Sequence, residues 1–386
     1  MLYFNFQNST KILFGQNKIQ NVAKEIKIYA DRILLVYGGG SIKQNGLYDS
    51  LCQELKAADI SYVELAGIQA NPRIDHVRAG VDLCRQHDLQ FILAVGGGSV
   101  IDCSKLMAAG FYYEADPWDF MIYKAKIRQA LPIGTILTIA ATGSEMNGNA
   151  VISNDVTSEK LSVSSSALNP VFSILDPTYS MSLPPMQTAA GIADIMSHVC
   201  EQYFSANPGA YLGDRLGEAI LNTCIHYGPL VLQKPEDYEA RANLMWAGTL
   251  ALNGMLAAGK STDWATHGME HEVSALYDLT HGVGLAILTP AWMRYVLQED
   301  TVEKFSAFAR NVWKLNGEDS VELALKGIQA TQKFFAELGL PERLSSVGVR
   351  QEDITLMAKK AVGFGPIGRF KVLEAADIEK IYQAAY

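Results

Sequence analysis

The sequence predicts a protein of two domains: an amino-terminal α/β domain with a Rossmann-like parallel sheet, residues 1–185, and an all-helical carboxy-terminal domain, residues 186–386. Three observations support this prediction. A chain of 386 residues exceeds the usual size of one domain. Its first half alternates short apolar runs with helical periodicity, which is typical of parallel strands joined by crossover helices. Beyond the Pro184-Pro185 pair, long amphipathic stretches rich in alanine, leucine and methionine indicate helices alone.

Within the first half, three apolar runs are predicted strands, and the stretches between them are predicted helices. The strands are residues 33–38 (ILLVYG), 61–65 (SYVEL) and 91–98 (FILAVGGG), and the first and third end on glycines. Residues 47–58 and 75–87 place apolar side chains at helical spacing between the strands. Strand–helix alternation of this kind predicts crossover connections, which make a sheet parallel.

The amino terminus and the helical half complete the predicted layout. The runs YFNF and KILFG predict a hairpin around Asn8 and Ser9. An exposed edge ribbon can pair with a second copy of the chain, and we therefore expect a homodimer. In the second half, residues 189–204 and 239–256 are the clearest amphipathic helices.

Composition and charge exclude several kinds of partner. The net charge is −9, whereas nucleic acids and anionic membranes attract clustered basic residues. The chain does not start like a signal peptide, and no apolar run is long enough to span a bilayer. An odd number of scattered cysteines predicts free thiols in a reducing compartment, at Cys52, Cys84, Cys103, Cys200 and Cys224. We expect a cytoplasmic protein without a nucleic-acid or membrane partner.

Two Gly-Gly-Gly-Ser runs follow predicted strands, at residues 38–41 and 96–99. The second run opens a predicted helix, where free backbone N–H groups and the helix dipole favour a phosphate. Glycine lets phosphate oxygens approach those donors because it has no β-carbon. A single run is most simply a tight turn, and the G-x-G-x-x-G fingerprint is absent. Two runs at the carboxyl ends of strands in one sheet favour dinucleotide binding.

The first glycine run bears on the choice of nicotinamide cofactor. An NAD site usually places an acid near the strand end, where it binds the ribose 2′-hydroxyl and repels a 2′-phosphate. Here the run continues through Ser41 to Lys43 without an acid, and both side chains suit a phosphate. The simpler alternative is that Lys43 is a solvated surface charge. We predict NADP(H) in preference to NAD(H).

One aspartate and several histidines form a second constellation. Asp194 and His198 are four residues apart, which places both side chains on one face of a helix. His267 and His271 have the same spacing, and His281 follows ten residues later. One carboxylate and three imidazoles suit Zn(II) or Fe(II) and leave a coordination position open, whereas Mg²⁺ and Ca²⁺ prefer oxygen ligands. The spacing leaves open which histidines bind, and it also allows hydrogen-bonded core histidines without a metal.

With both constellations in view, the chain resembles the iron-containing (group III) alcohol dehydrogenase family, in its butanol dehydrogenase and NADPH-dependent aldehyde reductase branch. The resemblance covers essentially the whole chain, and GGGSVIDCSK matches the family's GGGSxxDxxK cofactor motif in full. The other matching segments are FNFQNSTKILFG, GGGSIK, ATGSEMNGNAVI, ILDPTYSMSLP, GIADIMSHVCEQYF, ARANLMWAGTLALNG and HEVSALYDLTHGVGLAILTPAWMRY. The resemblance implies a dinucleotide-binding α/β domain followed by a helical metal-binding domain.

The resemblance also implies roles for particular residues. The expected metal ligands are Asp194, His198, His267 and His281. The adenosine ribose is expected at Gly38, Gly39 and Ser41, and the pyrophosphate and nearby ribose at Gly97, Gly98, Ser99 and Asp102. The residues expected to line the rest of the cofactor site, or to lie close to it, are Thr138, Thr142, Asn147, Lys160 and Tyr179.

The implied activity is hydride transfer between NADP(H) and short-chain aldehydes or primary alcohols such as butanal and butanol, assisted by one divalent cation. His271 is the candidate for assisting proton transfer, because it shares a helix face with His267 and imidazole titrates near neutral pH. Two alternatives are that His271 only packs against the nicotinamide, or that water and cofactor hydroxyl groups relay the proton.

Other functions of the same fold remain open. One is a polyol dehydrogenase of the glycerol type that uses NAD. Another is cyclisation of a sugar phosphate to dehydroquinate, which needs a basic cluster near the metal that Arg215, Lys260 and Arg294 do not supply. The third is a nucleotide-binding module without catalysis.

Overall fold

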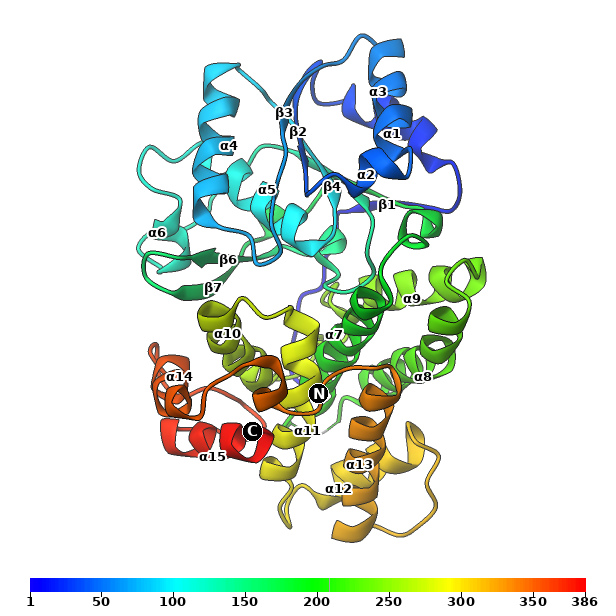
Figure 1. The fold of residues 1–386 in the computed structure, drawn as a ribbon, viewed down its shortest axis with the longest axis vertical. Helices are drawn as coiled ribbons and strands as arrows, with labels where there is room; N and C mark the ends of the chain where they lie inside the picture. The colour runs from blue at the N-terminus through cyan, green and yellow to red at the C-terminus, as the bar shows by residue number, and fades with distance from the viewer. Residues whose placement is uncertain (208) are drawn as a thin grey trace. The chain divides into compact units, whose positions relative to one another are not determined.

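The computed structural model describes residues 1–207 and 209–386. These residues form two units (Figure 1). What we call the sheet unit comprises Gln7–Leu183 and Pro235–Thr249, and the helical unit comprises Met1–Phe6, Pro184–Lys234 and Leu250–Tyr386. The predicted fold class, a Rossmann-like parallel α/β sheet followed by helices, is confirmed.

A six-stranded parallel sheet forms the centre of the sheet unit. Its strands lie in the order β1 (Lys11–Phe14), β8 (Phe172–Leu175), β5 (Ile133–Leu137), β4 (Ile92–Gly96), β2 (Arg32–Tyr37) and β3 (Ser61–Leu65). Side chains of β2 and β4 point alternately into two core clusters, one with Leu34, Val36, Ile92 and Ala94, the other with Ile33, Leu35, Leu93 and Val95. Because both faces are buried, these strands are continuous apolar runs, as predicted.

Helices and a short ribbon pack around this sheet. The helices are α1 (Val22–Ile26), α2 (Ser41–Gln44), α3 (Leu47–Ala57), α4 (Ile74–Gln86), α5 (Gly98–Gly110) and α6 (Trp118–Met121). Side chains of α4 and α5 belong to one core cluster and those of α1 and α3 to the other, so the two pairs cover opposite faces (Figure 1). The ribbon pairs β6 (Asn149–Asn154) with β7 (Glu159–Ser164) in antiparallel register. α5 begins where β4 ends, which places its amino end at the carboxyl edge of the sheet.

The predicted amino-terminal hairpin is wrong. Residues 1–10 contain no strand, and β1 joins the sheet edge parallel to β8, with Lys11 opposite Phe172. The side chain of Asn8 explains the difference: its Oδ1 accepts from Thr10 N at 3.1 Å, and its Nδ2 donates to Met146 O at 2.8 Å. A bond to residue 146 cannot be seen in a local pattern, which identifies Asn8 only as a turn residue.

The segment around α9 (Tyr238–Ala251) groups differently from the predicted division at residue 185. Pro235–Thr249 belongs to the sheet unit. Met245 lies in a core cluster of that unit, and Trp246 packs edge-on against Phe14 with ring centroids 6.1 Å apart. The sheet unit is therefore built from two separate stretches of the chain.

The helical unit is arranged around α7 (Pro185–Tyr203), which is buried on every side from Thr188 to its end. A helix that is buried all round is the central one of its unit. The other helices of this unit are α8 (Tyr211–Gln233), α10 (Ala265–Tyr277), α11 (His281–Val296), α12 (Val302–Asn311), α13 (Val321–Glu337), α14 (Ile354–Ala361) and α15 (Ala375–Ala385). Every helix in the described part of the chain is too short or too polar to span a bilayer.

One close approach fixes the start of α11 against α7. A β-carbon on Gly282 would come within 2.0 Å of Ala190 O, so only glycine fits at this position. The neighbouring residue, His281, is the first of α11, and Asp194 lies one turn beyond Ala190 on α7. The contact therefore holds a histidine beside an aspartate.

Candidate metal centre and nucleotide site

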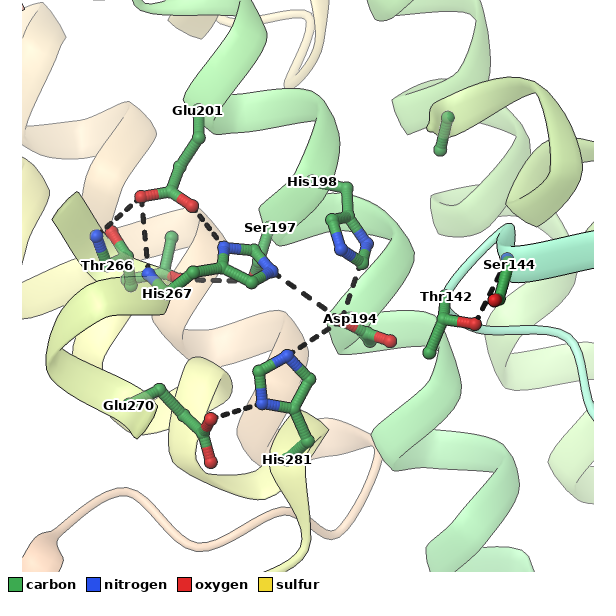
Figure 2. Close-up of polar contacts among 12 residues, drawn as sticks. Thr142, Ser144, Asp194, Ser197, His198, Glu201, Thr266, His267, Glu270 and His281 are labelled. Carbon is green, nitrogen blue, oxygen red and sulfur yellow. Dashed lines mark hydrogen bonds and ion pairs between the residues drawn. The ribbon is translucent and has the colours of Figure 1, made fainter. Parts of the chain in front are cut away.

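Three histidines gather around one carboxylate oxygen in the helical unit (Figure 2). Asp194 and His198 lie one turn apart on α7. His267 lies in the first turn of α10, and His281 begins α11. The distances from Asp194 Oδ1 are 3.3 Å to His198 Nδ1, 3.7 Å to His281 Nε2 and 3.9 Å to His267 Nε2. The structure thus brings together the four residues expected to hold a metal.

The donor atoms of this cluster fit a cation. His198 Nδ1 and His267 Nε2 are buried, and neither has a hydrogen-bond partner among the described residues. A buried polar atom without a partner costs about 1–3 kcal/mol, a cost that a cation among the nitrogens removes. Burial, together with the neighbouring His267 and His281, lowers the pKa of His198 well below its usual value, which keeps the imidazole neutral. One carboxylate and three imidazoles fit Fe(II) or Zn(II).

Two buried carboxylates behind the histidines were not predicted from the sequence. Glu201 hydrogen-bonds to Nδ1 of His267, and Glu270 hydrogen-bonds to Nδ1 of His281. Burial opposes a charge on His267, but the charge of Glu201 and its hydrogen bond outweigh burial and raise the pKa of His267. The sequence held a signal for Glu201, because it lies seven residues after Asp194 and therefore two turns along the same face of α7.

The predicted proton-transfer residue, His271, lies one turn after His267 on α10. Its ring centroid is 5.7 Å from that of His281. Ligand atoms of Glu270, His271 and His281 lie within 4.8 Å of one another, and the Glu270–His281 hydrogen bond is part of this group. The ring of Trp264 is 5.3 Å from that of His267 on the same helix end. The structure therefore places His271 next to the cluster around Asp194.

The second glycine run of the sheet unit lies under one of the chain's own loops. A β-carbon on Gly98 would come within 2.4 Å of Thr142 Oγ1, and one on Gly97 within 2.2 Å of Ile139 Cγ2. Packing of the loop after β5 therefore requires both glycines, whatever ligand is bound. The first N–H groups of α5, which begins at Gly98, still lie at the sheet edge expected for a phosphate.

The first glycine run is more open. A β-carbon on Gly39 would meet nothing within 4 Å. Gly40 has a φ of 105°, a conformation that side chains rarely adopt, and Ser41 then begins α2. Ser41 is exposed. The chain itself therefore does not cover Gly39, in contrast to the second run.

The aspartate and lysine of GGGSVIDCSK are both buried. Asp102 accepts hydrogen bonds from Ser144 Oγ at 2.5 Å and from Val151 N at 2.9 Å. Lys105 Nζ donates to Ser144 Oγ at 2.7 Å and to Asn149 O at 2.8 Å. Burial lowers the pKa of Lys105 to about 8, although Asp102 opposes the shift. This pair holds the loop after β5 and the start of β6 against α5.

The remaining predicted nucleotide residues lie in different parts of the sheet unit. Thr138 follows β5, and its N–H bonds back to the end of β4 at 3.1 Å, next to the second glycine run. Asn147 Oδ1 accepts from Lys105 Nζ at 3.0 Å within the buried network. Lys160 is buried in β7, and Tyr179 packs against the core cluster on the face covered by α1 and α3. The structure therefore groups Thr138, but not Tyr179, with the second run.

The lysine after the first glycine run is held by aromatic rings and an acid. Lys43 Nζ lies 4.4 Å from the ring centroid of Tyr48 and 5.1 Å from that of Tyr37. It is also 3.9 Å from Glu64 Oε2. Burial alone would raise the pKa of Glu64, but hydrogen bonds from both tyrosine hydroxyls lower it, so the carboxylate stays charged. Glu64 lies on β3, the strand beside the run, so the residues of the run itself do not predict this acid.

Two family models match nearly the whole chain. The model described as iron-containing alcohol dehydrogenase matches residues 9–177, and the model described as Fe-containing alcohol dehydrogenase family, C-terminal, matches residues 188–386. The chain therefore belongs to the iron-containing alcohol dehydrogenase family, as its motifs predict. Membership of this family makes it an oxidoreductase.

Similar proteins narrow the family to one branch. The chain is 51% identical to NADH-dependent butanol dehydrogenase A of Clostridium acetobutylicum, over 100% of both chains. It is 40% identical to an NADPH-dependent aldehyde reductase of Escherichia coli, over 99% of both chains. The crystal structure of NADH-dependent butanol dehydrogenase A from Thermotoga maritima matches with a TM-score of 0.97 and 42% identity, covering 100% of this chain and 99% of that one. The predicted branch is confirmed.

Proposed function

We propose that the chain is a metal-dependent alcohol dehydrogenase that acts mainly as an aldehyde reductase. It transfers a hydride between NADP(H) and short-chain aldehydes or primary alcohols such as butanal and butanol. The observation that carries this proposal is the buried cluster around Asp194, in which His198 Nδ1 and His267 Nε2 have no hydrogen-bond partner among the residues described. The names of similar proteins, butanol dehydrogenases and an aldehyde reductase, support the substrate class.

One Fe(II) or Zn(II) ion would be held by Asp194, His198, His267 and His281. When bound, such an ion supplies a Lewis acid for a carbonyl oxygen. The chain itself contributes burial of the donor atoms, which excludes water and strengthens the electrostatic interactions among them. It also contributes the close contact at Gly282 that keeps His281 beside α7.

The nucleotide would bind at the two glycine runs. The amino end of α5, with Gly97, Gly98 and Ser99, would hold the pyrophosphate, and Gly38, Gly39 and Ser41 would hold the adenosine ribose. When bound, NADPH supplies the hydride. Thr138, Thr142, Lys160 and Tyr179 are proposed to line or flank the nucleotide. Asp102 and Asn147 serve it through the loop after β5, because their side chains bond to that loop.

The proposed preference for NADP(H) rests on the first glycine run. Ser41 and Lys43 are exposed, and the run itself carries no acid, whereas Glu64 of the neighbouring strand β3 lies 3.9 Å from Lys43 Nζ. Similar proteins differ in their names: those 51% and 50% identical are named NADH-dependent, and one that is 40% identical is named NADPH-dependent. The residues of this run are therefore the part of the chain on which the preference is to be tested.

His271 is proposed to deliver the proton that the new alcohol needs. It is half-buried next to the cluster around Asp194, and imidazole titrates near neutral pH. We also propose that the protein is a cytoplasmic homodimer. The five cysteines are free, which suits a reducing compartment.

The experiment that tests this function combines elemental analysis with a panel of substrates. Purified protein is expected to contain iron or zinc and to reduce butanal and other short aldehydes, with a higher kcat/KM for NADPH than for NADH. Glycerol, tested with NAD, serves as the polyol comparison. Uniform inactivity toward every short aldehyde would sink the assignment, and nucleotide binding without any metal would indicate a non-catalytic module.

A further inference from the structure

We propose that Glu201 and Glu270 are positioning residues that decide which nitrogen of His267 and His281 faces the metal, and so set how tightly the protein holds iron or zinc. The inference rests on the proposed metal centre. Each carboxylate is fully buried and hydrogen-bonds to Nδ1 of a histidine whose Nε2 faces Asp194 (Figure 2).

Glu201 holds both the ring of His267 and the backbone that carries it. Its Oε2 hydrogen-bonds to His267 Nδ1. Its Oε1 accepts from Thr266 N at 2.5 Å and from His267 N at 3.4 Å, both in the first turn of α10. One carboxylate on α7 therefore caps the start of α10 and orients the imidazole in its first turn.

Glu270 orients His281 from within α10. Its carboxylate hydrogen-bonds to His281 Nδ1 and accepts from the hydroxyl of Ser274, one turn further along the helix. Gly284 provides the space, because a β-carbon there would come within 2.7 Å of Glu270 Cγ and 3.0 Å of its Oε1. The first turn of α11 thus packs directly over the carboxylate that orients its first residue.

These hydrogen bonds select one tautomer of each imidazole. A neutral imidazole carries its proton on Nδ1 or on Nε2. A carboxylate beside Nδ1 keeps the proton there and leaves the lone pair on Nε2. In His267 and His281, Nε2 is the atom that lies 3.9 Å and 3.7 Å from Asp194 Oδ1. His198 is arranged differently, because its Nδ1 is the atom that faces Asp194, at 3.3 Å.

The two carboxylates also change the charge around the cluster. Together with Asp194 they make three buried acids within one group of side chains. Electrostatic attraction between a dication and these acids is stronger in a buried place than in water. Removing either carboxylate therefore weakens metal binding in two ways, through the tautomer and through the charge.

The test replaces each carboxylate by its uncharged isostere, Glu201→Gln and Glu270→Gln. A glutamine amide that donates to Nδ1 forces the imidazole proton onto Nε2. The zinc dissociation constant is measured on metal-free protein by competition with a chromophoric chelator, and we expect it to rise about 10- to 100-fold in each variant. The visible spectrum of the cobalt(II)-loaded protein is expected to change as well, because it reports the ligand geometry.

The matched control is Glu272→Gln, which removes another buried carboxylate from α10. Glu272 lies 3.3 Å from Lys360, and the variant is expected to keep the zinc affinity and the cobalt spectrum of the unmodified protein. A lower melting temperature of metal-free Glu201→Gln and Glu270→Gln with unchanged zinc affinity is what a purely structural role predicts, and it overturns the inference.

The remaining outcomes separate this inference from the proposed function. If both variants keep zinc affinity and spectrum while the unmodified protein binds zinc tightly, the positioning role is overturned and the metal centre stands. If the unmodified protein binds neither zinc nor iron, the metal centre fails and the inference fails with it. The two glutamates are tested separately, so misfolding of one variant leaves the other to decide.

Discussion

The network around α5 and the cluster around α7 differ in whether their buried polar atoms have hydrogen-bond partners within the chain. At α5, Lys105 donates three hydrogen bonds and Asp102 accepts two, so the chain satisfies its own charges. At α7, Asp194 faces three imidazoles, and nitrogens of His198 and His267 have no hydrogen-bond partner among the described residues. The first network is satisfied by the chain itself, whereas the second leaves donor atoms that we propose bind a cation.

This difference shows where to look for a ligand in a motif. In GGGSVIDCSK the charged residues serve the fold, and what remains for a ligand is backbone N–H at a helix end. In the segments that carry His198 and His267, side-chain nitrogens have no hydrogen-bond partner among the described residues and are therefore available to a ligand. A binding site is identified better by the groups that a fold leaves without partners than by the charges that a motif contains.

The largest effect is expected when one imidazole is removed from the cluster around α7. His267→Ala deletes a donor and leaves Glu201 buried without its histidine. We expect elemental analysis to find no bound metal, and aldehyde reduction to fall at least about a thousandfold, equivalent to about 4 kcal/mol. His226→Ala, at an exposed position on α8, is the control that should keep both. Full turnover by metal-free protein would refute the metal centre.

The network at α5 is broken by Lys105→Met, which leaves Ser144 Oγ, Asn147 Oδ1 and Asn149 O without the ammonium group that donates to them. A buried acceptor that loses its donor costs about 1–3 kcal/mol, so the free energy of unfolding in urea should fall by at least about 3 kcal/mol. Zinc affinity should stay unchanged, while the dissociation constant for NADPH should rise because the loop after β5 is released. The control is Lys326→Met, whose exposed ion pair with Glu322 contributes little. A loss no larger than that of the control would contradict the role of Lys105.

A smaller effect tests the first glycine run. Lys43→Ala removes the cation that we expect to meet a 2′-phosphate, and kcat/KM for NADPH should fall about tenfold while that for NADH stays unchanged. Steady-state kinetics with both cofactors measures the two values. Lys56→Ala, on the exposed side of α3, is the control. An equal loss with both cofactors would mean that Lys43 does not discriminate between them.

The smallest effect is a pH dependence from the network at α5. The pKa of Lys105 is about 8 in the folded chain, below its ordinary value of 10.5, so between these values the unfolded chain binds more protons. Stability therefore rises with pH in this window, by at most about 1.4 kcal/mol per pH unit, and has no slope from Lys105 below pH 8. Urea unfolding of the unmodified protein and Lys105→Met across the window gives the difference. A flat difference would rule out the lowered pKa.

Most of the fold follows from local patterns. The strand at residues 33–38 was predicted within one residue of β2, because burial on both faces makes a parallel strand a continuous apolar run. The amino-terminal hairpin failed because the Asn8 side chain bonds to Met146, far along the chain. Pro235–Thr249 groups with the sheet unit, which the sequence does not predict, because helical periodicity does not indicate which hydrophobic core a helix joins.

Local spacing likewise predicts some residues of the site and not others. Helical spacing placed Asp194 and His198 on one face, but it could not choose between His271 and His281, because the chain turns back between α10 and α11. Asp278 takes a left-handed conformation in that turn, with a φ of 50°. Glu201 and Glu270 went unnoticed because each acts on a histidine of another segment. The spacing from Asp194 could have placed Glu201 on the metal-facing side of α7, but the pairing of each glutamate with its histidine has no local sequence signature.

The division of the chain between the two units has a consequence for its synthesis. All six strands of the sheet have been made once residue 175 leaves the ribosome, yet Pro235–Thr249 follows only after α7 and α8. The helical unit in turn contains both the first residues, Met1–Phe6, and the last. Neither unit is made of one consecutive stretch, whereas consecutive domains usually fold one after the other during translation. A gene split at residue 185 would therefore yield two incomplete fragments, each still needing a segment carried by the other.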